Sequence, residues 1–317
     1  MQNSTGKVKT EALLELAFMS RVNNFSSAHR YATEALGESR RTGDREQEAY
    51  ALYYLGMAYY YHSEIDTAMT FSRRSCVMAE SLNNHKLLGN IYLLMGSAII
   101  SITGIWKKPS TIMIRSIHHF LLAENYRGLG AAYSSLSRSS ASTDPDEKSL
   151  EFIHRASSNY RKAGYREGEA WIYYLTGLLY NSVELYDESE DALQRSLDIY
   201  RQIAEENGNV TGVAICLDQL AIVNAKSGNL VQARRDNQQA LELHRQGDSR
   251  FGISTSLKYR ADIEYRDRNY QYALFCLDSS LSIKKTTNDL MGYASVYELY
   301  GLIFAEDGQY PARDRQP

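Results

Sequence analysis

One pattern recurs along this chain and constrains its fold more than any other feature. An apolar and a small residue stand together at Leu220-Ala221, a turn with Gly228-Asn229-Leu230 follows, and Ala233 and Ala240 then lie seven residues apart. Small side chains at this spacing let two antiparallel helices pack closely, because larger ones would hold the helix axes apart. The pattern therefore predicts a helix, a short turn and a second helix packed on the first.

The same arrangement returns at a spacing of about 40 residues. The small residue that opens the second helix of each pair is found at Ala28, Ala68, Ser149, Ser189, Ala233 and Ala273. An internal repeat of this length means that each helix pair buries its apolar side against its neighbours in the array. The chain is thus predicted to be a linear stack of helix pairs rather than a single compact core.

Polar turns with glycine precede many of the first helices, as in Gly43-Asp44, Gly208-Asn209 and Gly247-Asp248. Glycine tolerates the left-handed backbone that ends a helix, and Asp or Asn caps the next helix by accepting its free N–H groups. These turns set the expected helix boundaries.

Taken together, these residues resemble the tetratricopeptide repeat (TPR) family, in the form with repeats of about 40 residues that occurs in arrays of bacterial signalling and regulatory proteins. The resemblance implies an all-α fold, a right-handed superhelical α-solenoid of antiparallel helix pairs with about seven and a half repeats over residues 10–310. Residues 1–9 are expected to form an N-terminal tail. Residues 311–317 are expected to form a C-terminal tail, which leaves truncation of a longer protein open.

Two segments depart from the repeat. The third repeat, at about residues 83–127, has Trp106-Lys107-Lys108-Pro109 where a small residue should open the second helix, so its packing is expected to differ. Residues 137–148 are rich in serine and read as an exposed loop between helices, with Asp146 capping the helix that follows.

Composition excludes several classes of function. The formal net charge of −3 gives no basic footprint for a nucleic acid or an anionic membrane. The N-terminus has no apolar signal segment, and no stretch is long enough to span a bilayer. Three cysteines without a CxxC pair fit a reducing cytoplasm. We expect a cytoplasmic protein with no membrane contact and no direct nucleic acid partner.

Motifs for catalysis and metal binding are missing from the sequence. It contains no phosphate-binding glycine loop, no HExxH, no GxSxG and no Cys/His set at zinc spacing. His118 and His119 are adjacent on a predicted helix, and their side chains point about 100° apart, so they do not chelate one ion together. The sequence predicts a protein that is not an enzyme and that has no cofactor and no metal.

The resemblance to TPR arrays also implies where a ligand binds, because first helices line the concave groove in that family. Carried over by register, the predicted groove residues are Tyr50, Tyr53, Met57, Tyr60, Trp171, Tyr174, Asn181, Gln219, Lys258, Tyr259, Tyr265 and Arg266. Asp218, beside Gln219, falls in the same register. Tyr and Trp suit a recognition surface because a rigid ring buries a large area at low entropic cost. Core packing between repeats is the alternative for each of these side chains.

Two functions are compatible with these features. The first is a non-catalytic scaffold that binds a protein segment or a peptide in its groove. The alternative is a ligand-responsive sensor of a bacterial signalling protein, either a peptide receptor or the sensory half of a kinase or diguanylate cyclase. A solenoid held by neighbour contacts can change pitch when a ligand binds. The sequence leaves a homodimer open and does not name the partner.

Overall fold

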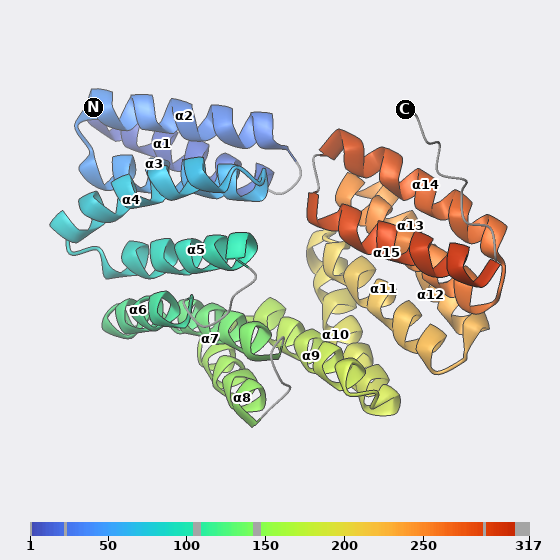
Figure 1. Ribbon diagram of the computed structural model, residues 1–317. Helices are drawn as coiled ribbons and strands as arrows, with labels where there is room; N and C mark the ends of the chain where they lie inside the picture. The colour runs from blue at the N-terminus through green and yellow to red at the C-terminus, as the bar shows by residue number, and fades with distance from the viewer. Residues whose placement is uncertain (1, 22–23, 104–108, 142–146, 288–289, 308–317) are drawn as a thin grey trace. The chain divides into compact units, whose positions relative to one another are not determined.

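The computed structural model describes residues 2–21, 24–103, 109–141, 147–287 and 290–307. Within these ranges it contains fifteen α-helices and no β-strand. The helices follow one another as antiparallel pairs, as Figure 1 shows within each part of the chain. The expected helix-pair α-solenoid of the TPR type is confirmed.

Odd-numbered helices are the first members of the pairs, and even-numbered helices are the second. The first helices are α1 (Gln2–Ser20), α3 (Arg45–Tyr61), α5 (His85–Thr103), α7 (Tyr126–Ala141), α9 (Arg166–Ser182), α11 (Thr211–Lys226), α13 (Arg250–Arg266) and α15 (Leu290–Asp307). The second helices are α2 (Phe25–Thr42), α4 (Ile65–Ser81), α6 (Pro109–Leu122), α8 (Glu147–Lys162), α10 (Tyr186–Asn207), α12 (Leu230–Gln246) and α14 (Tyr270–Thr287).

The chain divides into two compact units, unit 1 (Met1–Ile172) and unit 2 (Tyr173–Pro317). In unit 1, α1 contacts α3, α3 contacts α5 and α5 contacts α7; in unit 2, α11 contacts α13 and α13 contacts α15. Among the described helices, the second helices contact only the first helices on either side of them. First helices are therefore packed more closely than second helices within each unit. We call the side of a unit formed by its first helices the inner face.

Small residues allow the close packing within each pair, as the sequence predicts. Ala28, Ala68, Ser149, Ser189, Ala233 and Ala273 are all buried, with at most 1% of each residue exposed. Serines of second helices also donate hydrogen bonds to first helices, from Ser189 Oγ to the Gly177 carbonyl at 2.8 Å and from Ser280 Oγ to the Ser254 carbonyl at 2.6 Å. These bonds satisfy buried hydroxyls while they fix one helix on the other.

The turns follow the predicted chemistry with one correction. Gly43 ends α2 in the left-handed conformation at φ 71°, and the Asp44 side chain accepts the Gln47 N–H at 3.0 Å. Before α13 the expected roles of Gly247 and Asp248 are wrong by one residue. Asp248 is the left-handed residue, at φ 47°, and Ser249 caps the helix by accepting the Gly252 N–H at 3.2 Å.

Two further expectations need correction. Helix α1 begins at Gln2, so residues 2–9 belong to a helix rather than to a tail. The third repeat forms an ordinary helix pair, α5 and α6. Pro109 begins α6, where its missing N–H costs nothing, and buried Met113 packs on Gly96 in the way that Leu193 packs on Gly177. Residues 104–108, 142–146 and 308–317, with Trp106, Asp146 and the expected C-terminal tail, lie outside the described residues.

Candidate ligand-binding face

The inner face of unit 1 is mostly apolar, and two of its predicted groove residues are buried in the core. Tyr53 and Met57 on α3 are 8% and 7% exposed, and they pack with Leu87, Ile91 and Leu94 of α5. Burial raises the pKa of the Tyr53 hydroxyl far above its ordinary value. Both side chains hold neighbouring repeats together and leave little surface for a ligand.

Tyr50 and Tyr60 on the same helix are half-buried. Tyr50 lines a depression of about 350 Å³ between α1 and α3, together with Leu14, Gln47 and Tyr54. Tyr60 packs against the α3–α5 core. These two tyrosines keep part of their surface open, in contrast to Tyr53 and Met57.

Helix α9 carries three predicted groove residues. Trp171 is half-buried and belongs to unit 1, while Tyr174 and Asn181 belong to unit 2. Tyr174 is a core side chain with 8% exposure, and Asn181 is half-buried. Of this group, Asn181 has the clearest polar role, because its amide oxygen accepts a hydrogen bond from Lys226 Nζ at 3.1 Å.

The inner face of unit 2 brings several predicted residues together. Gln219 on α11 donates through Nε2 to the Tyr259 hydroxyl on α13 at 3.0 Å. The Lys258 ammonium lies 5.3 Å from the centre of the Tyr259 ring, within range of a cation–π contact. All three side chains are half-buried, so they combine a fixed position with accessible surface.

Charged groups continue this surface along α13. Arg266 is exposed, and its Nε donates to Asp262 Oδ2 at 3.1 Å. The Tyr265 hydroxyl donates to Glu306 of α15 at 2.7 Å, and this bond together with burial raises the tyrosine's pKa to about 12. Tyr265 is therefore occupied by a partner within unit 2, whereas Arg266 reaches solvent.

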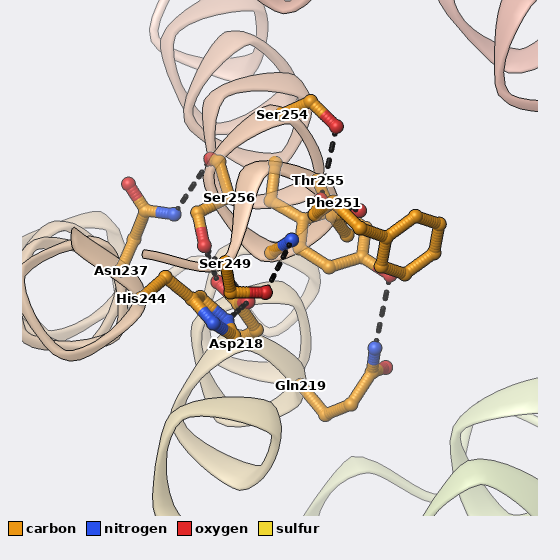
Figure 2. A network of polar contacts seen from close by, with 11 residues as sticks. Asp218, Gln219, Asn237, His244, Ser249, Phe251, Ser254, Thr255 and Ser256 are labelled. Atoms are coloured by element: carbon orange, nitrogen blue, oxygen red, sulfur yellow. Dashed lines mark hydrogen bonds and ion pairs between the residues drawn. The ribbon is translucent and has the colours of Figure 1, made fainter. Parts of the chain in front are cut away.

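Asp218, which precedes Gln219 on α11, is the centre of a buried polar network with Asn237, His244 and Ser256 (Figure 2). The Ser256 hydroxyl on α13 donates to Asp218 on α11 at 2.8 Å, and His244 Nε2 on α12 lies 3.1 Å from Asp218 Oδ2. Asn237 Nδ2 donates to the Ser256 carbonyl at 2.8 Å. One carboxylate thus joins three consecutive helices. Asp218 is 3% exposed, so its predicted place in the groove is wrong and its role is internal.

This network contains Ser, His and Asp but does not have the geometry of a hydrolase triad. A nucleophilic serine would donate to histidine, whereas Ser256 donates to the carboxylate. Burial raises the pKa of Asp218 above its ordinary value, and the hydrogen bonds from His244 and Ser256 oppose that rise. Gly252 admits the His244 ring, because a Cβ there would lie 2.1 Å from Nδ1. The arrangement fixes the packing of the helices.

Sequence reasoning missed two sets of contacts. His119 on α6 meets His85 on α5, with 3.1 Å between their Nδ1 atoms, and burial lowers the pKa of His119. Lys226 on the inner face of unit 2 was also missed, although it stands 40 residues before Arg266 and the repeat could have identified it. In the described part of the chain, no group of three or more His, Cys, Asp or Glu side chains is arranged to hold a metal ion.

None of the helices, over the ranges that the structure describes, is both long enough and apolar enough to cross a membrane. All three cysteines are free, and Cys216 and Cys276 are buried. Burial raises the pKa of Cys216 to about 12 and that of Cys276 to about 11, as expected of core thiols.

Comparison with solved structures agrees with the fold. A Rap protein in complex with competence and sporulation factor matches with a TM-score of 0.67 and 14% identity, over 97% of this chain and 88% of that chain. NprR in complex with its cognate peptide NprX matches with a TM-score of 0.57 and 14% identity, over 98% and 75%. BtubC from P. vanneervenii matches with a TM-score of 0.57 and 15% identity, over 71% and 92%. No family model and no curated protein matches the sequence.

Proposed function

We propose that this chain is a non-catalytic TPR-type module that binds a peptide or a protein segment on the inner face of unit 2. The observation that carries the proposal is the clustering of Gln219, Lys258, Tyr259 and Arg266 on neighbouring helices, half-buried or exposed and partly joined to one another. Such a surface offers one aromatic ring, one amide and two cations to an extended ligand.

The polar network around Asp218 supports the proposal. Asp218 joins α11 to α12 and α13, so the side chains of the face stand on helices that are already fixed relative to one another. A preorganised surface binds more tightly because less conformational entropy is lost on association. Two of the similar structures are complexes, a Rap protein with competence and sporulation factor and NprR with its cognate peptide, which agrees with a peptide as ligand.

Site-specific photo-crosslinking tests the proposal. We would place p-benzoylphenylalanine at Leu302, which is 47% exposed on α15 and occupies the repeat position of Asp262. The matched control carries it at Phe275, which is 61% exposed on the second helix α14. In a lysate of the source organism, we expect the probe at position 302 to capture one defined protein segment that the probe at 275 does not. Equal capture at the two positions, or capture at 275 alone, would contradict binding on the inner face.

A second candidate function is a ligand-responsive sensor, and one comparison favours it. A signal transduction ATPase from Pyrococcus horikoshii, whose tetratricopeptide repeats are described as a sensor, matches over 94% of this chain and 44% of that chain with a TM-score of 0.58. A sensor must change conformation on binding. Spin labels on α2 and α12 would show a changed distance distribution when the crosslinked segment is added as a peptide, whereas a simple scaffold would show none.

We further propose that the protein works in the cytoplasm, because its three cysteines are all free. Whether the chain is a monomer or a homodimer stays open. Light scattering of the purified chain would measure its mass in solution and decide between the two.

A further inference from the structure

Lys258 is a cation without a carboxylate partner. Within the described residues, no carboxylate oxygen lies within 4.0 Å of Lys258 Nζ, so Lys258 forms no ion pair. The nearest candidate on its own helix, Asp262, pairs with Arg266 at 3.1 Å. Asp218, at the equivalent position of the preceding repeat, is held by His244 and Ser256. No carboxylate of the described residues therefore forms an ion pair with Lys258, although Glu298 acts on its charge from a longer distance.

Lys226, on the neighbouring first helix α11, also has no carboxylate partner among the described residues. Its Nζ donates to the neutral Asn181 amide oxygen at 3.1 Å, so its charge is hydrogen-bonded but not neutralised. Lys226 stands at the repeat position of Arg266, eight residues beyond the position of Lys258. Eight helical residues span about 12 Å, so the two ammonium groups stand on neighbouring helices at different heights along the inner face.

The surroundings of Lys258 raise the cost of its charge. Burial lowers the pKa of this ammonium from its ordinary value, and Lys284 and Arg266 act in the same direction. Asp262 and Glu298 partly oppose the effect from a distance. A half-buried charge interacts more strongly with an incoming opposite charge than an exposed one does, because fewer water molecules screen the pair.

We propose that the segment bound on the inner face of unit 2 carries a carboxylate that pairs with Lys258, and that Lys226 attracts negative charge further along the same face. This inference rests on the proposed function and specifies its ligand as a peptide that presents a carboxylate. The carboxylate comes from an Asp or Glu side chain or from a free C-terminus. Both sources offer two oxygen acceptors to the three donors of the ammonium group.

A random octapeptide library tests this chemistry with the full-length chain. The library is used in two forms, with a free C-terminal carboxylate and with a C-terminal amide, and retained peptides are identified by mass spectrometry. The wild-type chain is expected to enrich Asp and Glu in both forms if a side chain supplies the carboxylate, and to prefer the free-carboxylate form if the C-terminus does. From the strength of a charge-assisted hydrogen bond, we expect roughly 10- to 100-fold enrichment.

Three variants make the test specific. Lys258→Met is expected to abolish the acidic preference, and Lys258→Glu to reverse it toward Lys and Arg, whereas Lys285→Met, which removes an exposed lysine of α14, should leave it unchanged. Circular dichroism checks that each variant is folded. Retention of peptides by the wild-type chain with neither an enrichment of Asp and Glu nor a preference for the free-carboxylate form overturns this inference and leaves the proposed function standing. Retention of no peptide at all overturns the proposed function itself.

Discussion

The inner faces of the two units are built from the same repeat but differ in how deeply their side chains are buried. In unit 1 the register positions predicted to touch ligand hold Tyr53 and Met57, which are buried against α5. In unit 2 Tyr174 and Asp218 are buried as well, but Gln219, Lys258 and Tyr259 stay half-buried. Gln219 donates a hydrogen bond to Tyr259, and the Lys258 ammonium lies 5.3 Å from the centre of the Tyr259 ring. The repeat therefore fixes which register positions of a first helix face the inner side. The residues of the neighbouring first helix determine whether a side chain at such a position is buried or exposed.

The physical reason lies in the side chains of the next repeat. Helix α5 presents Leu87 and Ile91 to α3, so a tyrosine from α3 gains more by apolar burial than by remaining at the surface. Helices α11, α13 and α12 instead bury the Asp218 carboxylate, the Ser256 hydroxyl and the His244 imidazole, which satisfy one another. We conclude that apolar packing holds both units together, and that unit 2 adds a buried polar connection between α11, α12 and α13.

The largest expected effect tests the apolar half of this comparison. Tyr53→Ala should lower the free energy of unfolding by about 3–5 kcal/mol, because it leaves a cavity between α3 and α5. Urea denaturation followed by circular dichroism measures the loss. Tyr61→Ala, at a residue that is 46% exposed on the same helix, is the control and should cost less than about 1 kcal/mol. Similar losses in the two variants would mean that Tyr53 is not a core residue.

The polar half of the comparison is tested by Asp218→Ala. This change removes the acceptor of Ser256 and the partner of His244, and it should cost about 3 kcal/mol because buried polar groups are left unsatisfied. Hydrogen exchange with mass spectrometry should show faster exchange in α11, α12 and α13 and no change in unit 1. Asp262→Ala removes a less buried carboxylate with a single arginine partner, and it should cost about 0.5 kcal/mol. If both variants exchange alike, the network does not hold the helices.

A smaller, pH-dependent effect is expected at the ion pairs between α12 and α13. Arg234 Nε and Nη2 donate to the two oxygens of Glu264 at 2.9 and 3.0 Å, and Arg260 Nε donates to the same carboxylate at 2.8 Å. Burial alone would raise the pKa of Glu264, but these arginines lower it below its ordinary value. A carboxylate whose pKa is lower in the folded state stabilises the fold above its unfolded pKa, and that stability is lost as the pH falls through the folded value.

Arg234→Met measures this contribution. It should cost about 2 kcal/mol at pH 7, where Glu264 is ionised in both states. At pH 3 the difference between the variant and the wild type should shrink, because Glu264 then approaches protonation and no longer needs the arginine. Urea midpoints at the two pH values give the comparison. A difference that does not change with pH would show that Arg234 acts by packing alone.

The fold could be predicted from the small residues of the sequence, but the burial of its large side chains could not. Ala28, Ala68 and Ser189 are buried as expected, because close helix packing requires small side chains wherever two helices cross. Tyr53 and Lys258 occupy related register positions and differ in burial because of residues on the adjacent first helix, about 40 positions away. No local pattern marks the meeting of Asp218 with His244 and Ser256, which are 26 and 38 residues from it.

The smallest expected effect concerns the pair on the proposed binding face. Gln219→Ala and Tyr259→Phe should each lower the free energy of unfolding by about 0.5–1 kcal/mol, since each removes one half-buried hydrogen bond. In a double-mutant cycle the two losses should not add, and the coupling should be close to 1 kcal/mol. Such coupling would mean that this part of the face is ordered before a ligand arrives, in line with the polar network around Asp218. No coupling would mean that the amide and the hydroxyl are both free to face a ligand, and unit 2 would then resemble a flexible surface more than a preorganised one.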